Sequence, residues 1–346
     1  MQEIDQRDRE LLNALQSDLP LVSTPFAVLG QSIDMSEKEV LKRAEKLKRE
    51  GLLRQISASF DTRALGYRSC LVAAEIAEDR TDHAASIVNL HPGVTQNYRR
   101  NHEFNLWFTL AVPPNSRLGI ERTVKVLEKE SGARLTRMFP TLRHFKNSGA
   151  SDWSEGQSDG GLDSAAGESV RNPVTDAEIE MVKLLQRDLP LLPRPWDALG
   201  RMVGVSGDDL LVAAKRLTSH QQIRRFSGSV PERKSGFSAT IMGVWVVPET
   251  RVEEIGATMA TYPSVSHSYI RPTYPDWPFN LFTTVHGRSV DECESALNGM
   301  ATDLQLTQMK ALYPIKEYKR SRISLFSPEL EEWEAGRLGE LESAAS

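Results

Sequence analysis

The sequence predicts an α+β protein in which a winged helix-turn-helix domain and a ferredoxin-like (βαββαβ) domain each occur twice. Three observations support this fold class. The chain repeats itself with an offset of about 170 residues, each copy begins with a three-helix rhythm, and the rest of each copy alternates strands and helices. With 346 residues the chain is long enough for several small domains, each with its own core.

The repeat is visible in several pairs of segments. LLNALQSDLPLVSTPFAVLG at 11–30 matches VKLLQRDLPLLPRPWDALG at 182–200, and HPGVTQNYRR at 91–100 matches YPSVSHSYIR at 262–271. The copies are joined by a stretch rich in Gly, Ser and Asp, which is typical of a flexible linker. The expected domains are two helix-turn-helix domains at 1–60 and 173–230, two ferredoxin-like domains at 61–146 and 231–326, the linker at 147–172 and a C-terminal tail at 327–346.

Each helix-turn-helix domain is expected to contain three helices. In the first copy, leucines recur at helical spacing over 8–16, and Pro25, which suits a first helical turn, opens the second helix. Ser36 is placed to cap the third helix, with Glu39 completing a capping box, and Gly51 ends it. The pattern is that of a winged helix-turn-helix.

The second part of each copy follows the order strand, helix, strand, strand, helix, strand. In the first copy these elements are expected at 67–76, 83–91, 94–100, 104–112, 118–130 and 134–145. In the second copy they are expected at 238–247, 252–262, 265–271, 279–287, 290–300 and 306–318. This order is the ferredoxin-like pattern.

The segment SEKEVLKRAEKLKREGLLRQ at 36–55 resembles the recognition helix and wing of the leucine-responsive (Lrp/AsnC) regulators. That family joins a helix-turn-helix to a ferredoxin-like domain, and two of its sheets pack face to face in a dimer. The resemblance implies that this chain is a covalent pseudo-dimer.

Strand periodicity places unusual polar residues on the helix-free face of each sheet. In the second copy this face carries His267, Tyr269 and Arg271, together with Asn280, Phe282, Thr284 and His286. In the first copy it carries Tyr98, Arg100, Asn105 and Trp107, whereas Phe104, Leu106, Phe108 and Leu110 point toward the helices. Such a face is either a polar, ion-paired interface or a cavity for a flat anionic ligand.

Two pairs of segments are longer and more specific: YRRNHEFNLWFT with FPTLRHFK in the first copy, and SHSYIRPTYPDWPFNLFTTVHG with LYPIKEYKRSR in the second. These pairs resemble the two subunits of sirohaem (siroheme) decarboxylase. The resemblance implies a carboxy-lyase that removes the C12 and C18 acetate carboxylates of sirohaem to give 12,18-didecarboxysirohaem. The fused arrangement is similar to the single-chain form of haem d1 biosynthesis, with the alternative haem pathway as the other setting.

This chemistry needs cations for the substrate carboxylates and an acid to protonate the methylene that remains after carbon dioxide leaves. The candidate acids are His102, Tyr98, His267, Tyr269 and His286. The candidate substrate-binding residues are Arg99, Arg100, Arg271, Asn105, Trp107, Asn280, Trp277, Lys146 and Lys319. His83, His91, His144 and His220 are interpreted as surface or structural. No organic cofactor and no metal of the protein's own is expected, and a histidine ligand to the substrate iron remains an alternative. The working half and the proton donor stay open.

The alternative function is a transcription regulator that senses haem or an amino acid, and a non-catalytic tetrapyrrole carrier is a third. Residues 1–60 hold nine Lys or Arg against ten Asp or Glu, and residues 174–230 hold eight against seven. Neither module is the basic surface that binding to DNA phosphates requires, so no DNA partner is expected. Further self-association and contacts with other haem d1 pathway enzymes stay open.

Composition suggests the compartment. The net charge is −5, and the two cysteines, Cys70 and Cys293, lie far apart in no metal-binding spacing. The charged N-terminus lacks the apolar stretch of a signal peptide, and no run has the roughly 18 apolar residues of a membrane span. A cytoplasmic protein without a membrane partner is expected.

Overall fold

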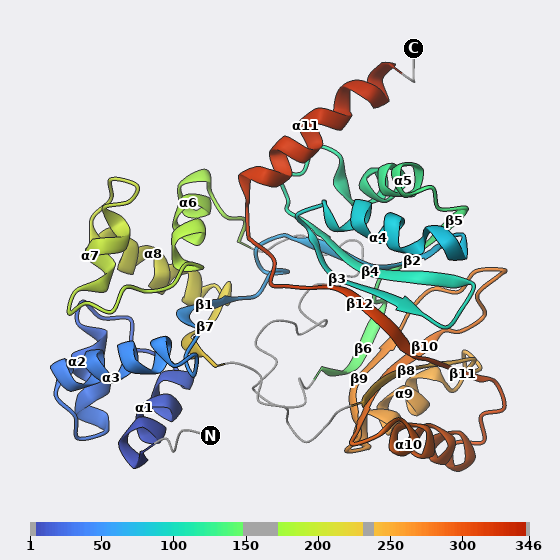
Figure 1. Cartoon of the computed structure of the whole chain (residues 1–346), viewed down its shortest axis with the longest axis horizontal. Coiled ribbons are helices and arrows are strands. Elements are labelled where there is room, and N and C mark those ends of the chain that lie inside the picture. The colour runs from blue at the N-terminus through green and yellow to red at the C-terminus, as the bar shows by residue number, and fades with distance from the viewer. Residues whose placement is uncertain (1–4, 148–171, 231–238, 344–346) are drawn as a thin grey trace. The chain divides into compact units, whose positions relative to one another are not determined.

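The computed structural model describes residues 5–147, 172–230 and 239–343, which divide into two compact units (Figure 1). The first unit contains residues up to Gly66 together with those from 172 to 230, and the second contains the other described residues. Each unit therefore combines corresponding parts of both copies of the repeat. Most of the predicted linker at 147–172 lies outside the described residues.

The first unit contains the two helix-turn-helix domains. In the first copy, the helices are α1 (Gln6–Gln16), α2 (Pro25–Ser32) and α3 (Glu37–Arg49), followed by strand β1 (Gln55–Phe60). In the second copy, they are α6 (Asp176–Leu185), α7 (Pro195–Gly200) and α8 (Gly207–Ser219), followed by strand β7 (Ile223–Ser229). The predicted three-helix pattern is confirmed in both copies.

The caps differ in one detail from the prediction. Ser36 accepts a hydrogen bond from the Glu39 N–H at 3.2 Å, as expected of an N-cap. The Glu39 carboxylate, however, accepts from Arg43 Nε at 2.9 Å, so this side chain serves α3 and does not close the predicted capping box. In the second copy, Thr175 and Glu178 form a complete capping box at the start of α6.

The two wings pair with each other, which the sequence did not predict. Strands β1 and β7 form a two-stranded antiparallel sheet. The repeated Asp-Leu-Pro motifs hold this sheet in a reciprocal way. Asp188 Oδ1 accepts the Ile56 N–H at 2.9 Å, and Asp18 Oδ1 accepts the Phe226 N–H at 2.9 Å. Each motif thus binds the wing of the other copy.

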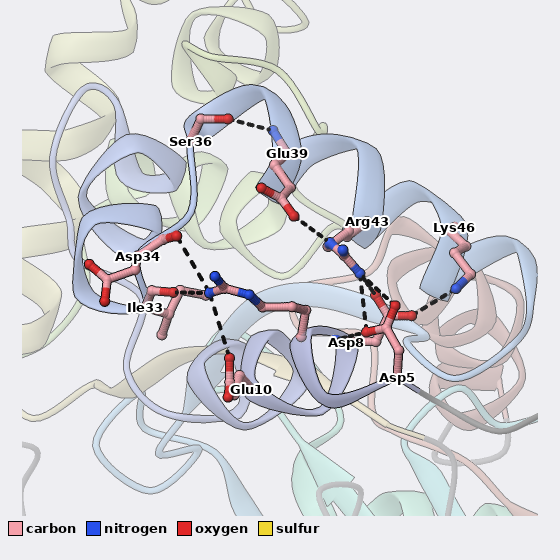
Figure 2. A network of polar contacts seen from close by, with 10 residues as sticks. Asp5, Asp8, Glu10, Ile33, Asp34, Ser36, Glu39, Arg43 and Lys46 are labelled. Atoms are coloured by element: carbon pink, nitrogen blue, oxygen red, sulfur yellow. Dashed lines mark hydrogen bonds and ion pairs between the residues drawn. The ribbon is translucent and has the colours of Figure 1, made fainter.

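Basic side chains on α3 are held by carboxylates from α1 (Figure 2). Asp8, whose side chain is 1% exposed, accepts from Arg43 and from Lys46 at 2.8 Å each. Asp5 accepts from Arg43 at 2.9 Å, and Lys48 donates to Asp188 at 2.6 Å. Breaking such a buried pair leaves an uncompensated charge, so the network fixes α3 against α1.

The second unit contains two five-stranded sheets. The first sheet is built mainly from copy one and has the order β12-β3-β4-β2-β5, with β12 (Pro314–Arg320), β3 (Val94–Arg100), β4 (Phe104–Val112), β2 (Arg68–Glu75) and β5 (Leu135–Phe139). The second sheet has the order β11-β8-β10-β9-β6, with β11 (Met309–Leu312), β8 (Ala239–Trp245), β10 (Leu281–Gly287), β9 (Val265–Ile270) and β6 (Arg143–Asn147). The helices are α4 (Thr81–Asn89) and α5 (Gly119–Ser131) in copy one, and α9 (Val252–Thr261) and α10 (Val290–Asp303) in copy two.

The last strand of each copy differs from the prediction. Segments 134–145 and 306–318 are not single strands, because each divides between the two sheets. Strand β6 of copy one pairs with β9 of copy two, and β12 of copy two pairs with β3 of copy one (Figure 1). Proline cannot donate to a ladder, and Pro140 follows β5 while Pro314 opens β12, so the chain leaves one sheet at these points. The two copies exchange their final strands.

Each sheet has an apolar core on its helix-covered face, and a third cluster joins the copies. This third cluster consists of Leu71, Ala73, Phe104, Trp107 and Phe139 from copy one and Val244, Trp277, Phe282 and Leu312 from copy two. The helix-free faces are therefore apolar in part. Phe104 was expected on the helix side, but the register shifts between Ala74 and Glu75, so that Phe104 packs beside Trp107 in this cluster.

The predicted tail contains a helix, α11 (Pro328–Ser343). Trp333 joins the core of the first sheet, and Arg337 forms an ion pair with Glu130 at 2.7 Å. Glu334 accepts the Arg117 N–H at 2.9 Å. Among the described residues, no helix combines the length and the apolar character needed to cross a membrane.

Candidate functional site

The two repeated asparagines bind the backbone of their own sheets. Asn105 Oδ1 accepts the Ile76 N–H at 3.1 Å and its Nδ2 donates to the Ile76 carbonyl at 2.8 Å. Asn280 makes the same pair of bonds to Val247, at 2.9 and 2.7 Å. The asparagine of each Phe-Asn-Leu motif thus holds, by two hydrogen bonds, the backbone of the residue that follows the first strand of its copy. The idea that these amides bind substrate stays a prediction.

The two repeated lysines bind carbonyl groups near the ends of helices. Lys146 Nζ donates to the Tyr262 carbonyl at 3.1 Å, after α9, and Lys319 Nζ donates to the Asn89 carbonyl at 3.0 Å, at the end of α4. Burial lowers the pKa of Lys319. Both lysines lie on exchanged strands, so each helps to hold its strand against the other copy.

The repeated Tyr-x-Arg motif has a similar role. Arg100 donates to the Leu312 carbonyl at 3.0 Å, and Arg271 donates to the Phe139 carbonyl. Both carbonyls lie where the chain is about to cross to the other sheet. Arg271 is buried beneath the rings of Tyr269 and Phe282, whose centroids are 5.1 and 5.6 Å from its guanidinium carbon. These contacts explain why both copies keep the motif.

Arg99 and the two tryptophans all contact other groups of the protein. Arg99 forms an ion pair with Glu78, in the short 3₁₀ helix that precedes α4. Trp107 and Trp277 are fully buried, with ring centroids 5.3 Å apart, in the cluster that joins the copies. Trp107 Nε1 donates to the Phe104 carbonyl at 2.6 Å.

His102 lies at the edge of the same aromatic cluster. Its Nδ1 accepts the Phe104 N–H at 3.0 Å, and its ring meets the Trp277 ring edge-on at 5.0 Å. Burial and the charge of Lys310 lower the pKa of His102 to about 4, against a smaller opposing effect of Glu103. None of these electrostatic neighbours is shared with the other candidate histidines.

The structure brings His267 and His286 together on the second sheet. Ser266 Oγ lies 2.7 Å from His267 Nδ1 and 2.7 Å from His286 Nε2. The other ring nitrogen of His286, Nδ1, lies 2.9 Å from Thr240 Oγ1. His267 Nε2 is buried and has no hydrogen-bond partner among the described residues. Three strands, β8, β9 and β10, thus supply one chain of polar groups that ends at His267 Nε2.

Burial dominates the ionisation of both rings. It lowers the pKa of His267 to about 4, with added effects of Arg271 and His144. It lowers the pKa of His286 to about 4, with added effects of His267 and Arg320. Both rings are therefore neutral near pH 7 in the free protein, and nearby anions would favour their charged forms.

Tyr98 and Tyr269 occupy equivalent places on the two sheets. The Tyr269 ring is buried, 5.7 Å from the His267 ring. Burial, followed by the charge of Glu317, raises the pKa of Tyr98 to about 12. Tyr98 thus remains protonated over the whole physiological range.

The polar chain exists in only one of the two copies. By the alignment of the repeats, Thr95, Gln96 and Ala111 occupy the positions of Ser266, His267 and His286. The sequence contained this signal, since it appears as soon as the repeats are compared position by position. It distinguishes copy two, whose helix-free face carries His267 and His286, from copy one, which has no histidine at the two equivalent positions.

One residue near this chain was interpreted as surface or structural. His144 lies on the exchanged strand β6, in register with Tyr269 on β9, and the two ring centroids are 6.3 Å apart. Sequence reasoning missed it because β6 was expected to stay in the sheet of its own copy.

The parts of the chain that the structure describes contain no cluster of metal ligands. Within them, no three His, Cys, Asp or Glu side chains are grouped in a way that could hold a metal ion. What the arrangement supplies chemically is an imidazole nitrogen, His267 Nε2, that is connected through Ser266 to His286.

Comparison with known proteins gives concordant results. A family described as AsnC-like ligand binding domain matches residues 64–146 and 234–319. A family described as siroheme decarboxylase NirDL-like HTH domain matches residues 8–54 and 178–224. Both families therefore match twice, once in each copy.

Whole-length relatives share the same description. The chain is 33% identical to the siroheme decarboxylase of Hydrogenobacter thermophilus, over 94% of this chain and 96% of that protein. It is 31% identical to the siroheme decarboxylase NirDL subunit of Paracoccus pantotrophus, over 85% of this chain and 89% of the relative. The crystal structure of the siroheme decarboxylase NirDL in co-complex with an iron-uroporphyrin III analogue superposes with a TM-score of 0.79, at 32% identity, covering 99% of this chain and all of the other.

Proposed function

The chain belongs to the sirohaem decarboxylase family, and from this premise we propose that it removes the C12 and C18 acetate carboxylates of sirohaem to give 12,18-didecarboxysirohaem. The observation that carries the proposal is the chain of polar groups ending at His267 Nε2. It lies within a fold that is similar over its whole length to a siroheme decarboxylase crystallised with an iron-uroporphyrin III analogue.

The reaction requires one proton for each carboxylate removed. Cleavage of the bond between the methylene carbon and the carboxylate leaves the electron pair on the methylene, and the electron-poor macrocycle delocalises it. A proton then adds to that carbon to form a methyl group. A positioned imidazolium is suited to this general acid step.

His267 is the proposed proton donor, acting through Nε2. Its Nδ1 faces Ser266, and Ser266 faces His286, so the neutral ring with its proton on Nε2 can take up a second proton at Nδ1 along this chain, from the side of the exposed residue Thr240, and become the imidazolium that donates from Nε2. The buried ring is neutral in the free protein, and the carboxylates of a bound sirohaem would raise its pKa and charge it. The substrate thus helps to create the acid that it needs.

Copy two is the proposed working half. Its sheet carries His267 and His286, whereas copy one has Gln96 and Ala111 in their places. Neither replacement can donate a proton at physiological pH. The scheme uses no organic cofactor and no metal of the protein's own, since the iron belongs to the substrate.

The test is anaerobic incubation of the purified chain with sirohaem, followed by mass spectrometry of the tetrapyrrole. We expect the mass to fall by two carbon dioxide molecules without any added cofactor. An unchanged mass, beside an active decarboxylase treated in parallel, would refute the proposal.

A further inference from the structure

The strand exchange brings a third histidine to the histidine-bearing face of copy two. His144 belongs to copy one by sequence, but β6 pairs with β9 and sets His144 opposite Tyr269. The Tyr269 ring thus has two imidazole neighbours, with centroids 6.3 Å away for His144 and 5.7 Å away for His267. His144 also acts electrostatically on His267.

His144 and His267, the two imidazole neighbours of Tyr269, differ in their exposure to solvent. His267 is half-buried and its Nε2 is fully buried, so its charged form is poorly solvated in the free protein. His144 is exposed, so water can solvate its charged form at little cost. An exposed imidazole beside a buried one is suited to meet an anionic group of a ligand whose other end reaches the buried ring.

The equivalent position in copy one has the opposite character. There β12 pairs with β3 and sets Glu317 opposite Tyr98, as β6 sets His144 opposite Tyr269. Glu317 is exposed, and it acts on the Tyr98 hydroxyl both by charge and by a hydrogen bond. A carboxylate at this position repels a ligand that itself carries several carboxylates.

We propose that His144 binds a carboxylate of the tetrapyrrole substrate, and that the working site is therefore composite, with its acid from copy two and this contact from copy one. The reciprocal exchange places Glu317 at the matching position and makes the copy-one face unfit for the same ligand. The inference rests on the proposed function, since it names a further substrate contact of the same face.

The experiment compares three substitutions at one position. His144→Ala removes the contact, His144→Lys places a positive charge there, and His144→Glu copies the side chain found in copy one. Since exposed charged contacts contribute modestly, we expect KM for sirohaem to rise about threefold in His144→Ala and about tenfold or more in His144→Glu. His144→Lys should stay near the wild-type value, and kcat should change by less than about threefold in all three. Absorbance titration with iron-uroporphyrin III should show the same order of Kd values without turnover.

The control is His83→Glu, which makes the same change of charge at an exposed position of α4. It should leave KM, kcat and Kd unchanged. If the wild-type chain does not decarboxylate sirohaem, the proposed function fails. If the wild type is active but His144→Glu has unaltered KM and Kd, only the present inference is overturned. A fall in kcat with unchanged KM would also overturn it, because His144 would then act on the chemical step.

Discussion

The Ser266 hydroxyl oxygen lies 2.7 Å from Nε2 of His286, on the adjacent strand β10. The same oxygen lies 2.7 Å from Nδ1 of His267, so one hydroxyl faces two imidazole rings. A hydroxyl both donates and accepts, and it can therefore pass a proton from one ring to the other. This relationship gives the copy-two face its proposed function in proton transfer.

Replacing His267 or Ser266 is expected to slow the chemical step. His267→Gln keeps a polar side chain but cannot deliver a proton, so kcat should fall by roughly 10² to 10⁴ while the Kd for iron-uroporphyrin III changes little. Ser266→Ala should give a smaller fall in kcat, because His267 keeps its place but loses the hydroxyl through which Nδ1 of the neutral ring takes up its second proton. Product mass in timed assays gives turnover.

The matched control for Ser266→Ala is Thr95→Ala, which removes the hydroxyl at the equivalent position of copy one. It should leave kcat near the wild-type value. Equal losses in both variants, at unchanged melting temperature, would show that the two faces contribute alike and would contradict the assignment to copy two.

His102 was a candidate acid on sequence grounds, and its surroundings suggest another outcome for His102→Ala. The change removes the acceptor of the Phe104 N–H and a ring contact with Trp277. We expect a loss of about 1 kcal/mol in the free energy of unfolding, with kcat within about threefold of wild type. Urea unfolding and turnover measure the two effects. A hundredfold fall in kcat with unaltered stability would restore His102 as the proton donor.

Substrate binding should take up protons. The pKa of His267 is about 4 in the free protein, and bound carboxylates should raise it. Binding favours the protonated ring, so affinity should fall as pH rises from about 4 toward the pKa in the complex, and it should level off above that value. Calorimetric titration at about pH 5.5, in two buffers of different ionisation enthalpy, counts the protons. His267→Gln should reduce the number, and an equal count in both proteins would argue against this role.

The helix-turn-helix unit should not bind DNA specifically. On α3, Arg43 and Lys46 form ion pairs with Asp8 (Figure 2). Lys48 forms an ion pair with Asp188, so these three cations are not available to phosphates unless ion pairs break. We expect no footprint on the promoter region of its own gene at about 150 mM salt, where non-specific contacts weaken strongly. A protected site under those conditions would revive a regulatory role.

The sequence by itself determined the duplication, the helix-turn-helix pattern and the order of strands and helices in each copy. These features follow from periodicity, caps and turn residues, which act over a few residues and are legible without tertiary contacts. It also determined which face of β9 holds His267, because side chains of a strand alternate. The contrast between Gln96 and His267 is also present in the sequence, but the working half stayed open until the structure placed Ser266 and His286 beside His267.

Only the tertiary structure decided where the last strands pair and which polar side chains are hydrogen-bonded to other groups of the protein. Strand β6 joins the other copy because a sheet edge at β9 is available there, and no local pattern encodes the choice of edge. For the same reason the sequence left His144 outside the site. The partners of Asn105 and Arg271 are likewise backbone groups distant in the chain, and a buried polar side chain acquires its role from whichever group the fold places beside it.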